Sequence, residues 1–273
     1  MAVTFNTLSK DATIFSELNK KHGWWDTFKK DNSLYIEIRK DNQVNVYFEG
    51  GSIARIHYCS RHKKLQVFTH HKYLGISEDK PTYPECSDYI GDIINNVLSL
   101  VKKNYSQKHS ADGVTPKEKW SEKYIQSELI LNSRNIHIDS EFAYKDGTND
   151  IRIDLVNVID GAVTFVELKR LDDPRMLKST EENPEVVEQM EGYSTFINKY
   201  SDDILKYYQR VYDIKKHLGL PLPDSYPTSV NKTPELLIFD RWEKSTKDRE
   251  THRRRMESIL KRENVTFKII STL

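Results

Sequence analysis

The dipeptide Asp160-Gly161 lies between two runs of residues that favour β-strands, and it limits the possible folds more than any other feature of the chain. The first run covers residues 151–158 and the second covers residues 163–169. Asp-Gly between such runs is the strongest short-range signal for a β-hairpin with a two-residue turn. We therefore predict a hairpin centred on this dipeptide.

The turn also predicts the register of the hairpin, because residues equally far from it face each other across the two strands. One face is aliphatic and suits a core, with Leu155 opposite Val166. The other face carries two carboxylates and two cations on strands otherwise rich in Val and Phe: Asp154 opposite Glu167, and Arg152 opposite Lys169.

Opposed carboxylates repel each other, and a bound cation removes that repulsion. Mg²⁺ takes oxygen ligands and keeps several waters, so Asp154 and Glu167 would form a suitable half-site for this ion. Lys169 would then orient an attacking water or stabilise a pentavalent phosphate. The alternative is a solvated edge of an antiparallel sheet, in which the same charges form cross-strand ion pairs.

A helix is predicted from Thr115 toward Asn132, and it places a further carboxylate. Thr115 to Glu118 form a capping box with proline at the first helical position. The apolar stripe runs through Trp120, Tyr124 and Leu131, and Glu128 falls on it. A carboxylate on a buried face needs a partner; the alternative is a glutamate at the edge of the stripe that reaches water.

A second helix is predicted to start near Asn183-Pro184, and Gln189 and Tyr193 share one of its faces. Both side chains can donate hydrogen bonds from an otherwise apolar surface, as a site for a phosphodiester backbone requires. The alternative is an ordinary amphipathic helix that packs against a core.

Taken in order, these elements resemble the PD-(D/E)XK nuclease superfamily, and in particular its RecB-like branch. The family pattern is a helical glutamate, an aspartate on one strand, Glu-x-Lys on the next strand and a helix with Gln-x-x-x-Tyr. This chain offers Glu128, Asp154, Glu167-Leu168-Lys169, and Gln189 with Tyr193. The resemblance implies an α/β fold with a restriction-endonuclease-like mixed sheet flanked by helices, in residues 115–273.

The resemblance also implies a site that holds one or two Mg²⁺ or Mn²⁺ ions. Glu128, Asp154, Glu167 and the backbone carbonyl of Leu168 would be the metal ligands, and Lys169 would sit beside the attacking water. Gln189 and Tyr193 would position the substrate. The chain has only two cysteines, so the four-cysteine iron–sulfur cluster of some RecB-like exonucleases is not expected.

The rest of this half is predicted to extend the sheet. Residues 236–239 form a continuous apolar run typical of a buried central strand. A helix over residues 243–262 and a strand over residues 265–270 follow, which indicates a crossover to a parallel strand. Another helical pattern over residues 204–212 ends at Gly219, before a proline-rich loop.

The overall charge of the chain does not indicate nucleic-acid binding, since 42 basic and 41 acidic residues give a formal net charge of +1. The region from Lys244 to Arg262 is locally basic, and its run Arg253, Arg254 and Arg255 would contact phosphates. A solvated helix surface is the alternative. A homodimer or a partner subunit would supply further contacts with DNA.

The N-terminal part is predicted to be a separate α+β domain over residues 1–80. Alternating strands over residues 34–39, 44–49, 53–58 and 65–69, with short connections, indicate an antiparallel meander. A helix and a polar linker, the latter over residues 102–113, would fill residues 81–114. Its histidines and cysteines lack the ordered spacing of a zinc site, and its ligand is not predicted.

The sequence therefore predicts a metal-dependent deoxyribonuclease, more specifically an endonuclease of restriction, repair or defence against mobile elements. No signal peptide and no apolar run near 20 residues is evident, and the cysteines lie in different segments, so we expect a cytoplasmic protein without a membrane span. The alternatives are a catalytically silent nuclease-fold subunit that binds nucleic acid or assembles with a partner, and a ribonuclease, because the same chemistry cuts RNA.

Overall fold

The computed structural model describes residues 5, 7–20, 22–91, 93–108, 121–145, 150–176, 184–241 and 246–273. The chain divides into two compact units. The first holds Val3–Arg134 and Arg210–Leu222, and the second holds Asn135–Gln209 and Pro223–Leu273. The domain boundary predicted at residue 114 lies outside the described residues, as does the predicted capping box of Thr115 to Glu118.

The first unit contains the predicted antiparallel meander, with strands in the order β1-β2-β3-β4. One face of the sheet is aliphatic because Ile36, Val46 and Ile56 alternate with polar residues along their strands. Short 3₁₀ turns lie at Lys40–Asn42, His71–Leu74 and Ser87–Tyr89. The other elements are α1 (Thr13–Leu18), α2 (Gly23–Lys30), β1 (Leu34–Arg39), β2 (Gln43–Phe48), β3 (Gly51–Cys59) and β4 (Lys64–Phe68).

Helix α3 (Ile94–Lys108) corrects the prediction of a linker that begins at Lys102. Its buried stripe is Ile94, Leu98, Val101 and Tyr105, so the helical period continues one turn further than the aliphatic residues alone indicate. Lys102 lies within this last part and donates hydrogen bonds to Asp31 and Ser33. The polar residues of this stretch therefore belong to a helix surface.

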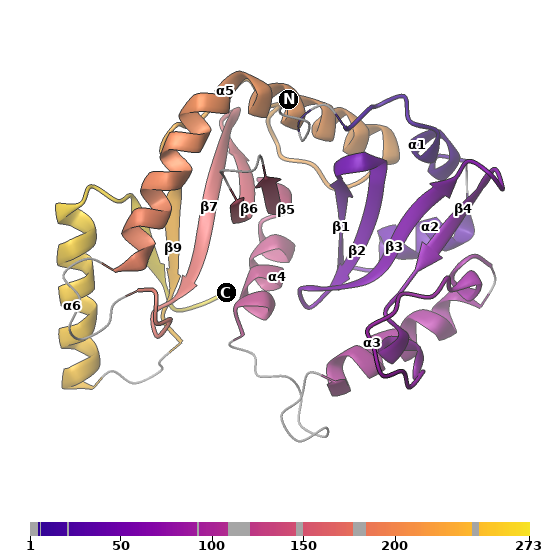
Figure 1. Cartoon of the computed structure of the whole chain (residues 1–273), viewed down its shortest axis with the longest axis horizontal. Coiled ribbons are helices and arrows are strands. Elements are labelled where there is room, and N and C mark those ends of the chain that lie inside the picture. Colours follow the sequence, from indigo (N-terminus) through magenta and orange to yellow (C-terminus); the bar gives the residue numbers. More distant parts are fainter. Residues whose placement is uncertain are drawn as a thin grey trace. The chain divides into compact units, whose positions relative to one another are not determined.

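The second unit is built on a mixed sheet with strands in the order β10-β9-β7-β6-β5, with β8 beside β7. Figure 1 labels β9, β7, β6 and β5 of this sheet. Strands β5, β6 and β7 pair antiparallel, whereas β7, β9 and β10 pair parallel. The chain is thus a mixed α/β protein with sheets flanked by helices, as predicted. The strands are β5 (His137–Lys145), β6 (Asp150–Ile159), β7 (Ala162–Arg170), β8 (Ser229–Val230), β9 (Glu235–Phe239) and β10 (Phe267–Ile270).

The segment β9, α6 (Lys247–Arg262) and β10 forms the predicted crossover between parallel strands. Strand β5, in contrast, was not predicted, because Asp139 and Ser140 interrupt its apolar pattern at buried positions. The Asp139 carboxylate is satisfied there, since it accepts hydrogen bonds from the Ser140 backbone N–H and the Tyr208 hydroxyl. Tertiary hydrogen bonding therefore overrides the polar character of this strand.

Helix α5 (Glu185–Leu218) joins into one element the two helices predicted around residues 189 and 204–212. It begins directly after Pro184 and ends before Gly219, whose positive φ of 65° closes it as predicted. Tyr200 has non-helical angles (φ −113°, ψ 19°) and marks a kink. No helix among the described residues combines the length and the apolar character that crossing a bilayer requires.

Candidate active site

The β6–β7 hairpin of the second unit has the predicted turn, and it has the predicted register as far as Leu155 and Val166. The predicted pairings of Asp154 with Glu167 and of Arg152 with Lys169 lie beyond the end of this register among the described residues. Asp160 (φ 50°) and Gly161 (φ 82°) both have positive φ, as a type I′ turn requires. The strands pair from Ile159 with Ala162 to Leu155 with Val166. Beyond this point β7 pairs with β9, and the side chains of Glu167 and Lys169 are buried. The alternative of a solvated sheet edge is therefore wrong for Glu167 and Lys169.

Asp154 stands where the regular pairing of the hairpin ends. Among the described residues, the β6–β7 register reaches no further than Leu155 and Val166. Instead, Asp154 Oδ2 accepts a hydrogen bond of 2.9 Å from the backbone N–H of Leu168. The Asp154 carboxylate thus takes the place of a ladder hydrogen bond and is fixed beside the residue that follows Glu167.

Glu167 and Lys169 form a buried ion pair, with 3% and 1% of their side chains exposed. The Lys169 ammonium donates to Glu167 Oε1 and to the carbonyl oxygen of Leu168, the latter at 3.2 Å. The predicted second cation of this face, Arg152, is 79% exposed and lies 3.7 Å from Asp150. The face therefore carries one buried cation rather than two, because β6 diverges from β7 beyond Leu155.

Helix α5 supplies the predicted pair Gln189 and Tyr193, and both reach this cluster. Gln189 Nε2 donates to Glu167 Oε1 at 2.7 Å and to the Tyr193 hydroxyl at 2.6 Å. The Tyr193 hydroxyl in turn donates to the carbonyl oxygen of Arg152. Burial, and then the negative charge of Glu167, raise the pKa of Tyr193 above its usual range, so the hydroxyl keeps its proton.

The backbone carbonyl of Arg152 is a part of the cluster that sequence reasoning missed. No pattern of side chains in the sequence indicates which backbone carbonyl oxygen will belong to a site. The Arg152 carbonyl is free to accept from Tyr193 because β6 no longer pairs with β7 at this point.

Asp173, just after β7, was also missed. Burial acts to raise its pKa, but hydrogen bonds from Arg175 and the charge of Lys169 outweigh it and hold the pKa below its usual value. Lys169 is thus within electrostatic range of a second carboxylate.

The two oxygens of the Glu167 carboxylate differ in their surroundings. Oε1 accepts from both Lys169 and Gln189, whereas Oε2 is buried and makes no hydrogen bond to any residue that the structure describes. An unpaired buried carboxylate oxygen is costly and calls for a ligand. Within the described residues, no group of three or more His, Cys, Asp or Glu side chains is arranged for a metal. The available oxygens suit Mg²⁺, which uses one or two carboxylates and keeps several waters.

Glu128 lies on α4 (Glu122–Asn132), in the first unit, so the cluster described here is formed without it. The buried residues of α4 are Ile125, Gln126, Ser127 and Ile130. The predicted stripe through Tyr124 and Leu131 is therefore wrong, and its third member, Trp120, lies outside the described residues. Glu128 is half-buried, and after burial its charge is the main cause of the raised pKa of Tyr124.

The arginines of α6 are largely engaged with acidic neighbours. Arg253 Nε lies 2.9 Å from the Glu257 carboxylate, and Arg253 Nη1 lies 3.4 Å from the Asp240 carboxylate. Arg254 is 82% exposed and lies 4.0 Å from Glu250. These pairings are those of a solvated helix surface, and contact of Arg253, Arg254 and Arg255 with nucleic acid stays a prediction.

Comparison of the chain with protein-family models, with curated proteins and with solved structures found no match. The geometry of the cluster is therefore the basis for the function proposed below.

Proposed function

We propose that this chain is a metal-dependent nuclease with a restriction-endonuclease-like second unit, and that it hydrolyses DNA phosphodiesters as an endonuclease. The proposal rests on the different surroundings of the two carboxylate oxygens of Glu167. One carboxylate oxygen is held by Lys169 and Gln189, and the other is buried without a hydrogen-bond partner in the described part of the chain. A carboxylate held in this way by cationic and amide donors has one oxygen ready for a cation.

Asp154, Glu167 and the carbonyl of Leu168 would hold one or two Mg²⁺ or Mn²⁺ ions. Glu128, the further ligand that the resemblance implies, belongs to the first unit and is not used here. When bound, the ion would activate water and stabilise the charge of the phosphate. Lys169 would supply a fixed positive charge beside the same carboxylate. The neutral hydroxyl of Tyr193 and the amide of Gln189 keep Glu167 in place and would approach the substrate.

The second candidate is a nuclease-fold subunit that binds nucleic acid or a partner without cutting. Two of the three N–H donors of the Lys169 ammonium are used by Glu167 and the Leu168 carbonyl, and this favours a purely structural pair. The unpaired Glu167 Oε2 favours the enzyme, because a structural pair gains nothing from it. RNA remains an alternative substrate, since no residue of the cluster distinguishes the two polymers.

We further propose that the protein acts inside the cell, in restriction, repair or defence against mobile elements. Cys59 and Cys86 are free thiols, in keeping with a reducing compartment. A homodimer or partner subunit would enlarge the surface that binds DNA, because the chain itself is nearly neutral.

The proposal is tested by incubating the protein with supercoiled plasmid, linear duplex, single-stranded DNA and RNA, with Mg²⁺, Mn²⁺ or EDTA. Glu167→Gln runs beside wild type, because it keeps the size of the side chain and removes the charge. Metal-dependent cutting of DNA that the variant lacks would support the enzyme. Binding without cutting under every metal condition would support the silent subunit, and cutting of RNA alone would make the protein a ribonuclease.

A further inference from the structure

A polar pocket of about 470 Å³ lies at the kink of α5, within the second unit. The kink is at Tyr200, whose ring contacts Tyr144 and Phe196 with centroid separations of 5.1 and 5.2 Å. The pocket is large enough for a nucleotide-sized group. Its lining residues are Asn198, Lys199, Tyr200, Ser201, Asp202, Asp203, Lys206 and Lys232.

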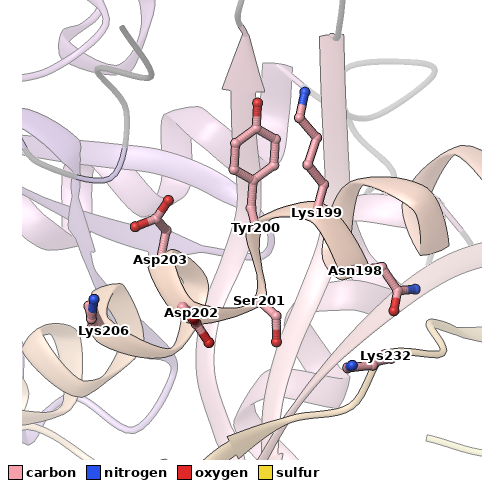
Figure 2. A pocket seen from close by; sticks show the side chains of 8 residues that line it. All are labelled: Asn198, Lys199, Tyr200, Ser201, Asp202, Asp203, Lys206 and Lys232. Carbon is pink, nitrogen blue, oxygen red and sulfur yellow. The ribbon is translucent and has the colours of Figure 1, made fainter.

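Two chain segments that are distant in sequence bring lysines to this pocket. Lys206 is on α5 beyond the kink, and Lys232 lies on the loop before β9. Figure 2 shows these two lysines at opposite ends of the pocket. The loop is anchored to α5 because Ser194 Oγ donates to the backbone carbonyl of Lys232 at 3.4 Å.

Neither lysine forms an ion pair within the described residues, unlike Lys64, Lys102 and Lys145. Asp202 and Asp203 also line the pocket, at the start of the helical segment that follows the kink. Carboxylates at a helix start are stabilised by the helix dipole, which gives them a structural role. The three lysines of the pocket outnumber these two carboxylates, so its net charge is positive.

The pocket lies on the same helix as the candidate active site. Ser201 follows Tyr193 by eight residues, which is about 12 Å of helix at ~1.5 Å per residue. Phosphates of one DNA strand repeat every ~3.4 Å along the duplex axis, so this span corresponds to about three or four nucleotides. A strand that is cut beside Glu167 therefore has later phosphates within reach of the pocket.

We propose that this pocket is a subsite for the backbone phosphates of the nucleic-acid strand, with Lys206 and Lys232 as the phosphate-contacting residues and Ser201 as a hydrogen-bond donor. The proposal rests on the nuclease function proposed above. It places the main backbone contacts of the second unit on α5 and the Lys232 loop. The paired arginines of α6 then contribute less.

The test is fluorescence anisotropy with labelled single-stranded and duplex DNA, measured over a series of salt concentrations in an Asp154→Asn background, which is expected to stay folded and not to cut. We expect Lys206→Gln/Lys232→Gln to weaken binding about tenfold and to lower the salt slope by nearly two, since each lost phosphate contact removes ~0.9 from it. Asp202→Asn should tighten binding. Lys216→Gln, on the same helix outside the pocket, is the matched control and should change neither quantity.

Unchanged affinity and slope in the double variant would overturn the subsite, and so would an equal effect of Lys216→Gln or no binding of DNA by the Asp154→Asn protein. Cutting by otherwise wild-type protein is measured separately and distinguishes the two proposals. If wild type cuts and the binding of DNA does not depend on Lys206 and Lys232, the subsite is refuted and the nuclease function is retained. Lysine-dependent binding without cutting would keep the subsite and refute the nuclease.

Discussion

Glu167 is the residue whose surroundings most need a chemical explanation. Its Oε1 accepts from Lys169 and Gln189, whereas Oε2 is buried and has no hydrogen bond among the described residues. A buried ion pair is often no more stable than a hydrophobic pair of similar size. Stability alone therefore gives no reason for this pair, whereas the proposed metal site would.

The Glu167–Lys169 pair should behave as a coupled unit in unfolding experiments. Lys169→Ala leaves a buried carboxylate without its cation, and we expect it to lower the free energy of unfolding by about 3–5 kcal/mol. Glu167→Gln/Lys169→Met removes both charges and should cost much less. Urea denaturation measures both variants. A double variant that loses as much stability as Lys169→Ala, or more, would mean that the two side chains do not interact.

Asp154 offers a separate test, because its carboxylate holds the Leu168 backbone N–H. Asp154→Ala leaves that N–H without an acceptor and should cost about 1–3 kcal/mol. Asp154→Asn retains an acceptor oxygen and should stay close to wild type in stability. Thermal unfolding followed by circular dichroism compares the two. Equal stability of the alanine and asparagine variants would show that this hydrogen bond contributes nothing.

At the scale of elements, the β6–β7 hairpin positions the cluster, and its turn has little freedom. Gly161 has φ +82°, and a Cβ there would lie 2.6 Å from Thr228 Oγ1. We expect Gly161→Ala to cost about 1–3 kcal/mol. Asp160→Gly at the neighbouring position, with φ 50°, is the control and should change stability by less than about 1 kcal/mol. Chemical denaturation measures the free energy of unfolding of both variants. Wild-type stability of Gly161→Ala would contradict the prediction that a side chain at this position strains the turn.

Local patterns predicted the elements whose determinants are local. The Asp160-Gly161 turn sets the register of β6 and β7, and Pro184 and Gly219 bracket α5. The exposure of Arg152, the burial of Asp139 and the kink at Tyr200 depend on contacts with other strands and helices. Those contacts leave no periodic trace in the sequence, so these features could not be predicted.

At the scale of the whole molecule, the chain passes between its two units more than once. Residues Arg210–Leu222 of α5 belong to the first unit, although the helix begins in the second. Within the first unit, Lys215 of this segment forms a buried ion pair of 2.9 Å with Glu37 of β1. The first unit therefore needs a segment that follows most of the second unit in sequence.

This interdependence predicts the effect of substitutions far from the candidate site. Glu37→Ala leaves Lys215 buried without that partner carboxylate and should lower the free energy of unfolding by about 3–5 kcal/mol, with Glu37→Leu/Lys215→Met losing less. A chain that ends at Arg134 lacks Lys215 and should show no cooperative unfolding. Cooperative unfolding of that short chain in urea would contradict the dependence on residues 210–222.

The most direct test is the cleavage rate of Asp154→Asn relative to wild type, on the DNA substrate that wild type cuts with Mg²⁺. Asparagine keeps the hydrogen bond to Leu168 and removes one charge from the proposed metal site, so the effects on folding and on metal chemistry are separated. We predict a loss of about a hundredfold or more, with an unchanged melting temperature. Cutting by Asp154→Asn at the wild-type rate, or cutting by wild type in EDTA, would contradict a metal-dependent site at Asp154 and Glu167.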